Sequence, residues 1–238
     1  MNLKKQKQQF IRINAEDTRK LYKACVEHKV ERFLFFSTND VYASSDKLIT
    51  EDTFTAPQSV YGKSKLIAEQ YLLEDSKRAN TAVCIFRPAS VYGENDKGSM
   101  KTLITLCRKG IVPMIGDGAH KKALLYLKDT VQAVERYIEC KNNHNGEIFN
   151  LSSGNFEYKE IIDIICSVFN FKPFRLFVPK WFCKQVASKI GPLKKLDIAS
   201  DTKIVSCHRA NRLLNYQSQY DLISGLKDSK LYYTKVIR

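Results

Sequence analysis

The sequence predicts an α/β protein: a parallel sheet covered by helices on both faces. Continuous apolar runs bounded by turn residues are typical of buried strands, and they occupy residues 33–36, 82–86 and 148–151. Amphipathic segments, which are typical of surface helices, lie at residues 14–29, 59–79, 99–109, 128–141 and 158–170. Strands buried on both faces that alternate with helices indicate parallel pairing, because each parallel connection needs a crossover element.

The last part of the chain has a different pattern. After Pro173 a segment rich in lysine and proline precedes two further predicted helices, at about 208–215 and 219–233. This change predicts a smaller carboxyl-terminal lobe. Aromatic residues among lysines within 174–190 fit either a helix lying on a membrane surface or packing against the sheet domain, and packing is the favoured interpretation.

Composition excludes several classes of protein. The chain has 238 residues, of which 44% are hydrophobic and 27% charged, as in ordinary globular proteins. Its seven cysteines are odd in number and scattered, with no CxxC pair and no histidine at zinc-ligand spacing, so we expect reduced thiols and no metal site. No segment reaches the ~18 apolar residues of a membrane span, and we expect a cytoplasmic protein.

The net charge of +14 admits nucleic acid, an acidic lipid surface or an anionic small substrate as a partner. The lysines are spread over the whole chain, and no basic run alternates with aromatic residues as in single-strand binders. A solvated basic surface is therefore favoured, and a nucleic-acid-binding module is a remote alternative.

A candidate catalytic pair lies at the start of the second predicted helix. Strand 33–36 runs into the polar segment 37–42 (STNDVY), at the edge where a parallel sheet holds its ligands. Tyr61 and Lys65 then fall one turn apart on the same helix face. A lysine ammonium near a phenol favours the phenolate, so Tyr61 is a candidate general base with a lowered pKa.

A second tyrosine–lysine pair has the same spacing. Tyr137 and Lys141 also match YxxxK, and twelve tyrosines in a lysine-rich chain should give about one match by chance. No hydroxyl cluster at a strand end precedes this second pair. We interpret it as a surface feature.

The order of the motifs is more specific than any one of them. RFLFF, STNDVY, ITEDTFTAP, YGKSKLIAEQYL and RPASVYG occur in succession. This succession resembles the extended short-chain dehydrogenase/reductases, specifically the NAD-dependent epimerase/dehydratase family acting on sugar nucleotides. The resemblance covers residues 11–165 and continues more loosely through IGDGAHKKALLYLKDTVQAV and HRANRLLNYQSQYDLISGL. It implies a partial Rossmann-type doubly wound sheet in residues 1–170, with 92–120 contributing to the substrate site, and a substrate-binding lobe in 171–238.

The resemblance also assigns roles to single residues. Tyr61 becomes the catalytic base, Lys65 steadies it and contacts the nicotinamide ribose, and Thr38 bonds the tyrosine and sugar hydroxyls. Contacts with the cofactor NAD, or NADP, are implied for Asn14, Ser37, Tyr61, Lys65, Pro88, Ser90 and Val91. Contacts with a nucleotide-sugar substrate are implied for Thr38, Asn39, Asp40 and Lys122, the last standing where many members place an arginine toward the diphosphate. For Thr38 and Asn14 the alternatives are an ordinary turn hydroxyl and a helix N-cap.

The family's glycine-rich turn, GxxGxxG between a strand and a helix, has no counterpart in the 238 residues. We expect a truncated reading frame or a second chain that supplies this part. The nicotinamide half of the cofactor site would then be present without the pyrophosphate half, so we expect weak NAD binding by the chain alone. The strand at 33–36 is expected to have an open edge.

The resemblance leaves several activities open. A sugar-nucleotide 4-epimerase or 4-keto reductase is favoured over a 4,6-dehydratase, because dehydratases of this family typically have STDEVYG where this chain has Asn39 and Asp40. An amide has no titratable proton with which to expel a hydroxyl. A non-catalytic remnant of the family is the other alternative. The resemblance also implies a homodimer through helices 14–28 and 60–78.

Overall fold

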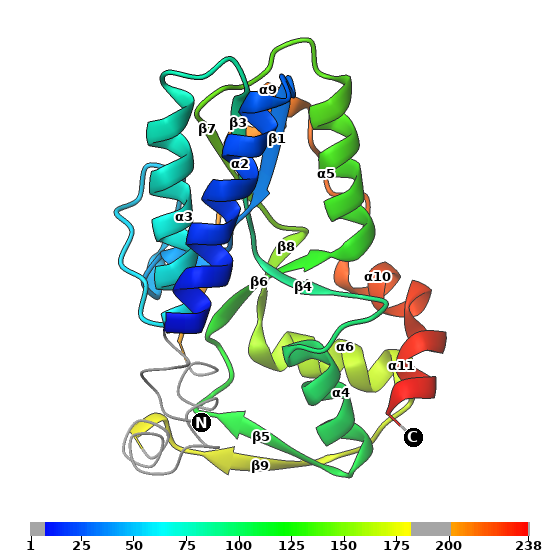
Figure 1. The fold of residues 1–238 in the computed structure, drawn as a ribbon. Helices are drawn as coiled ribbons and strands as arrows, with labels where there is room; N and C mark the ends of the chain where they lie inside the picture. Colours follow the sequence, from blue (N-terminus) through cyan, green and yellow to red (C-terminus); the bar gives the residue numbers. More distant parts are fainter. Residues whose placement is uncertain (1–7, 182–200, 238) are drawn as a thin grey trace.

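The computed structural model describes residues 8–181 and 201–237 (Figure 1). The first sheet contains the three strands that the sequence predicts, in the order β1-β3-β7. Both pairs are parallel, as expected from their apolar composition. The strands are β1 (Arg32–Phe36), β3 (Ala82–Pro88) and β7 (Glu147–Leu151).

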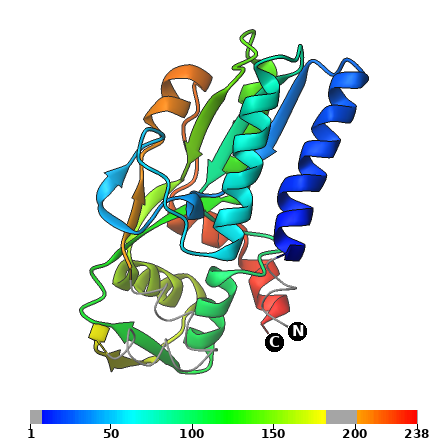
Figure 2. The same cartoon turned by 60° about the vertical axis from the view of Figure 1, so that its left-hand side comes forward.

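Two apolar cores cover this sheet, one on each face. Alternate residues of β3 point to opposite sides, so Val83 and Ile85 join one core while Cys84 and Phe86 join the other. Helices on one side are η1 (Arg12–Glu16), which has π-helical turns, α2 (Asp17–Glu27) and α3 (Val60–Ser76). Those on the other side are α5 (Leu127–Glu139) and α9 (His208–Leu214). Figure 2 shows α2 and α3 side by side on their face of the sheet.

The outer edge of β1 pairs with no strand among the described residues, as the sequence analysis predicts. Phe33 and Leu34 are only partly buried, and Phe36 remains 36% exposed.

A second sheet was not predicted from the sequence. Its strands follow the order β2-β10-β6-β4, with β8 antiparallel to β6. These strands are short and several carry lysines, so they lack the continuous apolar pattern of β1 and β3. They are β2 (Ser45–Ile49), β4 (Ser90–Tyr92), β6 (Lys121–Tyr126), β8 (Gly154–Glu157) and β10 (Lys203–Val205).

A third group packs below these sheets in Figure 1. Strands β5 (Ile111–Ile115) and β9 (Phe174–Val178) pair in parallel. The helices of this group are α4 (Ser99–Arg108), α6 (Tyr158–Phe169), α10 (Leu222–Asp228) and α11 (Lys230–Val236). Two predictions need correction here. The segment 219–233 forms two helices that meet at Ser229, and 174–178 is a strand, whereas 182–190 lies outside the described residues.

The segments on either side of residue 170 are interleaved in space. Val205, Ala210 and Leu214 join the core formed by β3, β7 and α5, while Leu226 and Tyr233 pack with α4 and α6. The predicted boundary between 170 and 171 therefore falls between segments that share their cores. No helix in the described parts of the chain is long and apolar enough to cross a membrane.

Candidate active site

The polar segment after β1 lies at the carboxyl edge of the first sheet. It forms a short 3-10 helix, η2 (Asn39–Val41), whose N-cap is Thr38. The Oγ1 atom of Thr38 accepts a hydrogen bond from the backbone N–H of Asp40 at 3.2 Å. The turn-hydroxyl role is therefore present in the structure, and the hydroxyl proton of Thr38 remains available to donate elsewhere.

The first turn of α3 packs directly against this segment. Ser59 caps the helix by accepting a hydrogen bond from the N–H of Gly62 at 2.8 Å. A Cβ atom on Gly62 would lie 2.4 Å from the carbonyl oxygen of Asp40, so only glycine permits this approach. The close contact places Tyr61, which is 37% exposed, beside η2 and at the carboxyl edge of the sheet.

Lys65 lies one turn further along α3. Its ammonium donates a hydrogen bond to the backbone carbonyl of Phe36 at 2.8 Å and lies 5.9 Å from the ring centroid of Tyr61. Burial lowers the pKa of Lys65. Lys65 is thus anchored at the end of β1 and lies near the ring of Tyr61.

The predicted lowering of the Tyr61 pKa is wrong for the chain as described. Burial raises the pKa of Tyr61, and the negative charge of Asp40 raises it further. The spacing of Tyr61 and Lys65 in the sequence does not reveal Asp40, whose negative charge also acts on the phenol.

Asn14 braces the start of α3. Its Nδ2 atom donates to the hydroxyl of Ser64 at 3.0 Å, and that hydroxyl donates to the carbonyl of Tyr61 at 2.8 Å. The N-cap alternative for Asn14 is wrong, because residues 8–11 before it are already helical. Asn14 instead lies within the π-helical turns Arg12–Glu16, a local distortion that is frequent at functional sites.

Further predicted residues follow the ends of β1 and β3. Ser37 is buried, and its hydroxyl oxygen has no hydrogen-bond partner among residues 8–181 and 201–237. Pro88 ends β3, and the exposed residues Ser90 and Val91 begin β4, with the Ser90 hydroxyl 3.1 Å from that of Ser99. A buried hydroxyl without a partner is unusual in a folded protein. Ser37 directly follows β1, where this hydroxyl is available to bind a polar group of a ligand.

Lys122 lies on β6 and is partly buried. Its ammonium donates to the carbonyl of Asp201 at 2.5 Å. Burial lowers the pKa of Lys122 to about 8, and the neighbouring charge of Lys203 also lowers it.

Lys203 was not predicted to belong to the site. It lies in register with Lys122 on the adjacent strand β10. Its ammonium donates to the carbonyl of Asn39, a carboxylate oxygen of Asp40 and the carbonyl of Tyr42, at 3.4, 3.3 and 3.2 Å. More than 160 residues separate it from these partners in the chain, and no local pattern marks it.

A network of buried polar side chains includes Tyr42, the last residue of the segment 37–42. Arg87 on β3 forms two hydrogen bonds with Glu69 on α3 and donates to the hydroxyl of Tyr42 at 2.6 Å. The Tyr42 hydroxyl donates to the side-chain oxygen of Asn150 on β7 at 3.0 Å. The motifs quoted from the sequence contain three of these residues, but no role was assigned to them. A charged residue at the end of an apolar strand is the signal that could have identified Arg87.

The interpretation of Tyr137 as a surface feature is wrong. Tyr137 is only 3% exposed and packs edge-to-face on Phe86, with ring centroids 6.0 Å apart, while Lys141 is exposed. Burial raises the pKa of Tyr137 to about 12. It is a core residue on the opposite face of the sheet from α3.

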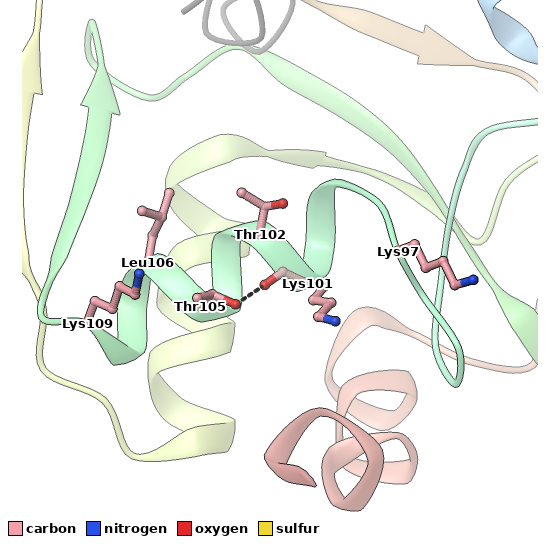
Figure 3. A pocket seen from close by; sticks show the side chains of 6 residues that line it. All are labelled: Lys97, Lys101, Thr102, Thr105, Leu106 and Lys109. Carbon is pink, nitrogen blue, oxygen red and sulfur yellow. Dashed lines mark hydrogen bonds between the residues drawn. The ribbon is translucent and has the colours of Figure 1, made fainter. Parts of the chain in front are cut away.

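The described surface also has a hollow of ≈ 390 Å³ on α4, shown in Figure 3. Its lining lies within the segment 92–120 that is expected to contribute to the substrate site, but it includes none of the single residues named for the site. Its lining residues are Lys97, Lys101, Thr102, Thr105, Leu106 and Lys109. Within 8–181 and 201–237, no group of three or more His, Cys, Asp and Glu side chains is arranged to hold a metal ion.

The parallel sheet with helices on both faces, and polar residues gathered at its carboxyl edge, defines a Rossmann-type protein. The NAD dependent epimerase/dehydratase family matches residues 3–152. This match covers well over half of the sequence, and the chain belongs to that family.

Two curated relatives show the range of activities. The chain is 26% identical to a UDP-glucose 4-epimerase from Vibrio cholerae over 91% of its length and 67% of the relative. It is 30% identical to human dTDP-D-glucose 4,6-dehydratase over 66% of the chain and 47% of that protein. The chain thus spans about two thirds of the first relative and about half of the second.

A solved structure has the same fold. UDP-glucuronic acid 4-epimerase from Bacillus cereus, in complex with UDP-glucuronic acid and NAD, superposes with a TM-score of 0.79 at 22% identity. The superposition covers 95% of this chain and 68% of the epimerase.

Proposed function

We propose that this chain is the catalytic part of an NAD(P)-dependent sugar-nucleotide 4-epimerase or 4-keto reductase. Its family is shown by the sequence match, and the named relatives act on nucleotide sugars. The observation that carries the proposal is the contact between Gly62 and the carbonyl of Asp40. This contact brings the first turn of α3, with Tyr61 and Lys65, against the segment that begins with Thr38.

In this proposal Tyr61 removes the proton from the sugar C4 hydroxyl. Thr38 donates its hydroxyl proton to orient the phenol and the sugar, and the ammonium of Lys65 favours the phenolate. NAD, when bound, supplies the hydride acceptor and donor. Return of the hydride to the opposite face of C4 gives the epimer, whereas the reduction step alone gives the 4-keto reductase.

The proposed cofactor contacts come from Asn14, Ser37, Tyr61, Lys65, Pro88, Ser90 and Val91. The unpartnered hydroxyl of Ser37 supports a polar ligand at the end of β1. In the described structure Asn14 contacts Ser64 and the start of α3, so its contribution is to hold that turn in place. Substrate contacts are proposed for Thr38, Asn39, Asp40 and Lys122. The ammonium of Lys122 offers the positive charge that suits a diphosphate.

Dehydration is the less favoured activity because the acid pair is incomplete. Asn39 is an amide, and the carboxylate of Asp40 forms an ion pair with Lys203 at 3.3 Å. The amide of Asn39 has no titratable proton to give a leaving hydroxyl, and the carboxylate of Asp40 is already engaged by Lys203. This arrangement supports epimerase or reductase chemistry.

The product mass distinguishes these activities. The chain, and a second version preceded by a glycine-rich βαβ unit, are incubated with NAD and UDP-glucose, UDP-glucuronic acid or dTDP-glucose. We expect a C4 epimer of unchanged mass, identified by its proton NMR spectrum, and none from the Tyr61→Phe variant. With a 4-keto sugar and NADH we expect the reduced sugar. A product lighter by one water would favour the dehydratase, and no turnover in either version would favour a non-catalytic remnant.

A further inference from the structure

We propose that Lys203 is a positioning residue of this active site. It holds the η2 turn in place and balances the charge of Asp40, and through both it controls how readily Tyr61 gives up its proton. The inference deepens the proposed function and rests on it for the role of Tyr61. Lys203 itself lies on β10, in a part of the chain to which the sequence analysis assigned no site residue.

The ammonium of Lys203 is directed at the turn. An ammonium has three N–H donors, and Lys203 directs them to three acceptors in the short stretch from Asn39 to Tyr42. Its side chain is only 18% exposed, compared with 48% for Asp40. All of its donors face the turn, so Lys203 acts as a clamp on this segment and leaves substrate contacts to other groups.

The turn that Lys203 holds is in direct contact with the helix that carries Tyr61. The carbonyl of Asp40 touches α3 at Gly62, the residue after Tyr61. A shift of the turn must therefore move the first turn of α3 as well. Burial raises the pKa of Tyr61, and the negative charge of Asp40 in this turn raises it further.

Lys203 also balances the negative charge of Asp40. The other cations near these groups are Lys122 on β6 and Lys65 on α3, and each donates to a backbone carbonyl elsewhere, of Asp201 and Phe36. Glu69, on the same helix as Tyr61, is bound to Arg87. Among the described residues, Lys203 is the one cation within ion-pair distance of the Asp40 carboxylate. Lys122 also interacts with the charge of Asp40, but without an ion-pair contact, so loss of Lys203 would leave the negative charge of Asp40 less compensated where it acts on Tyr61.

The test measures the ionisation of Tyr61 directly. The chain is labelled with 3-fluorotyrosine, whose phenol is more acidic than that of tyrosine, and titrated by fluorine NMR. The Tyr61→Phe variant assigns the resonance. We expect the midpoint of Tyr61 to move to higher pH in Lys203→Gln and to return toward the wild-type value in Lys203→Arg. Lys121→Gln, which removes an exposed lysine of β6, is the matched control and should leave the midpoint unchanged.

The variants of Asp40 keep the proposal testable if Lys203→Gln does not fold. Asp40→Asn removes the charge and should move the midpoint of Tyr61 to lower pH. In the double variant the upward shift caused by Lys203→Gln should largely disappear. An unchanged midpoint in a folded Lys203→Gln protein, or in Asp40→Asn, would overturn the proposal.

This titration needs neither substrate nor cofactor, so its result is independent of the proposed function. If the midpoint shifts in a chain that shows no turnover, the proposed role of Lys203 stands and the proposed enzymatic function is rejected. Where turnover is measured, the acid limb of the pH profile of kcat should move to higher pH in Lys203→Gln and recover in Lys203→Arg.

Discussion

Arg87 and Glu69 form a bidentate ion pair that is almost completely buried between β3 and α3. The two hydrogen bonds measure 3.0 and 2.5 Å, and the side chains are 4% and 1% exposed. Through Tyr42 the same guanidinium supports the segment that contains Thr38. The ion pair thus links α3, which carries Tyr61 and Lys65, to the segment 37–42 that follows β1.

Loss of one partner of this pair should destabilise the fold strongly. In Glu69→Gln the guanidinium of Arg87 stays buried without its counter-ion, and we expect a loss of about 3–5 kcal/mol in the free energy of unfolding. Urea denaturation followed by circular dichroism measures it. The control is Glu74→Gln, which breaks an exposed pair with Lys77 and should leave the free energy of unfolding nearly unchanged. Equal effects of the two changes would argue against a structural role for the buried pair.

Tyr61→Phe should abolish turnover and leave cofactor affinity nearly unchanged. The lost hydroxyl acts on a proton during the reaction, and general base catalysis is typically worth about 10²–10⁴-fold. Steady-state kinetics and calorimetric titration with NAD, both on the version that carries a glycine-rich unit, measure the two effects. Tyr137→Phe is the matched control, because it removes one hydroxyl from the core with a 3.4 Å contact to a backbone carbonyl. Full activity in Tyr61→Phe would exclude Tyr61 as the base.

The first sheet could be predicted from the sequence because each of its strands contains a run of apolar residues, and the central strand β3 is buried on both faces. β1, β3 and β7 are continuous apolar runs, and that pattern depends only on local sequence. The second sheet could not be predicted, since β10 has three residues and reaches β2 and β6 only through the tertiary fold.

The candidate site was predictable only where its residues are close together in the sequence. Tyr61 and Lys65 lie on one helix, so their spacing is visible in the sequence. The relation of Lys203 to Asp40 depends on strand order, and the raised pKa of Tyr61 depends on a contact through Gly62. Neither relation has a local signature.

Gly62→Ala should damage both stability and activity. The new Cβ would lie 2.4 Å from the carbonyl of Asp40, so the turn or the helix must move. Overpacking of this kind typically costs about 1–3 kcal/mol. Thermal denaturation and kcat are the measurements, with Lys63→Ala, an exposed neighbour on the same helix, as a control that should change stability by no more than about 0.5 kcal/mol. A wild-type kcat in Gly62→Ala would show that the close approach is dispensable.

The proposed homodimer through helices 14–28 and 60–78 also has a direct test. Leu21 on the first of these helices is 59% exposed, and an apolar contact with a second copy would cover it. Leu21→Glu would place a charge in that contact and should weaken association by at least about tenfold. Light scattering across a concentration series measures the oligomeric state. Leu48→Glu, at an exposed site on β2, should leave it unchanged, and a monomeric wild-type chain would reject the proposed interface.

The binding of nucleotide sugars should weaken as the pH rises through the pKa of Lys122. That pKa is lowered to about 8 by burial, so the side chain is mostly charged at pH 7 and roughly 90% neutral at pH 9. An ammonium attracts the diphosphate and a neutral amine does not, so the affinity is present below pH 8 and is lost above it. Calorimetry with UDP-glucose should show a loss of up to about tenfold between pH 7 and pH 9. Lys122→Arg keeps its charge throughout this range and should bind equally at both values. A wild-type affinity that does not change with pH would place the diphosphate away from Lys122.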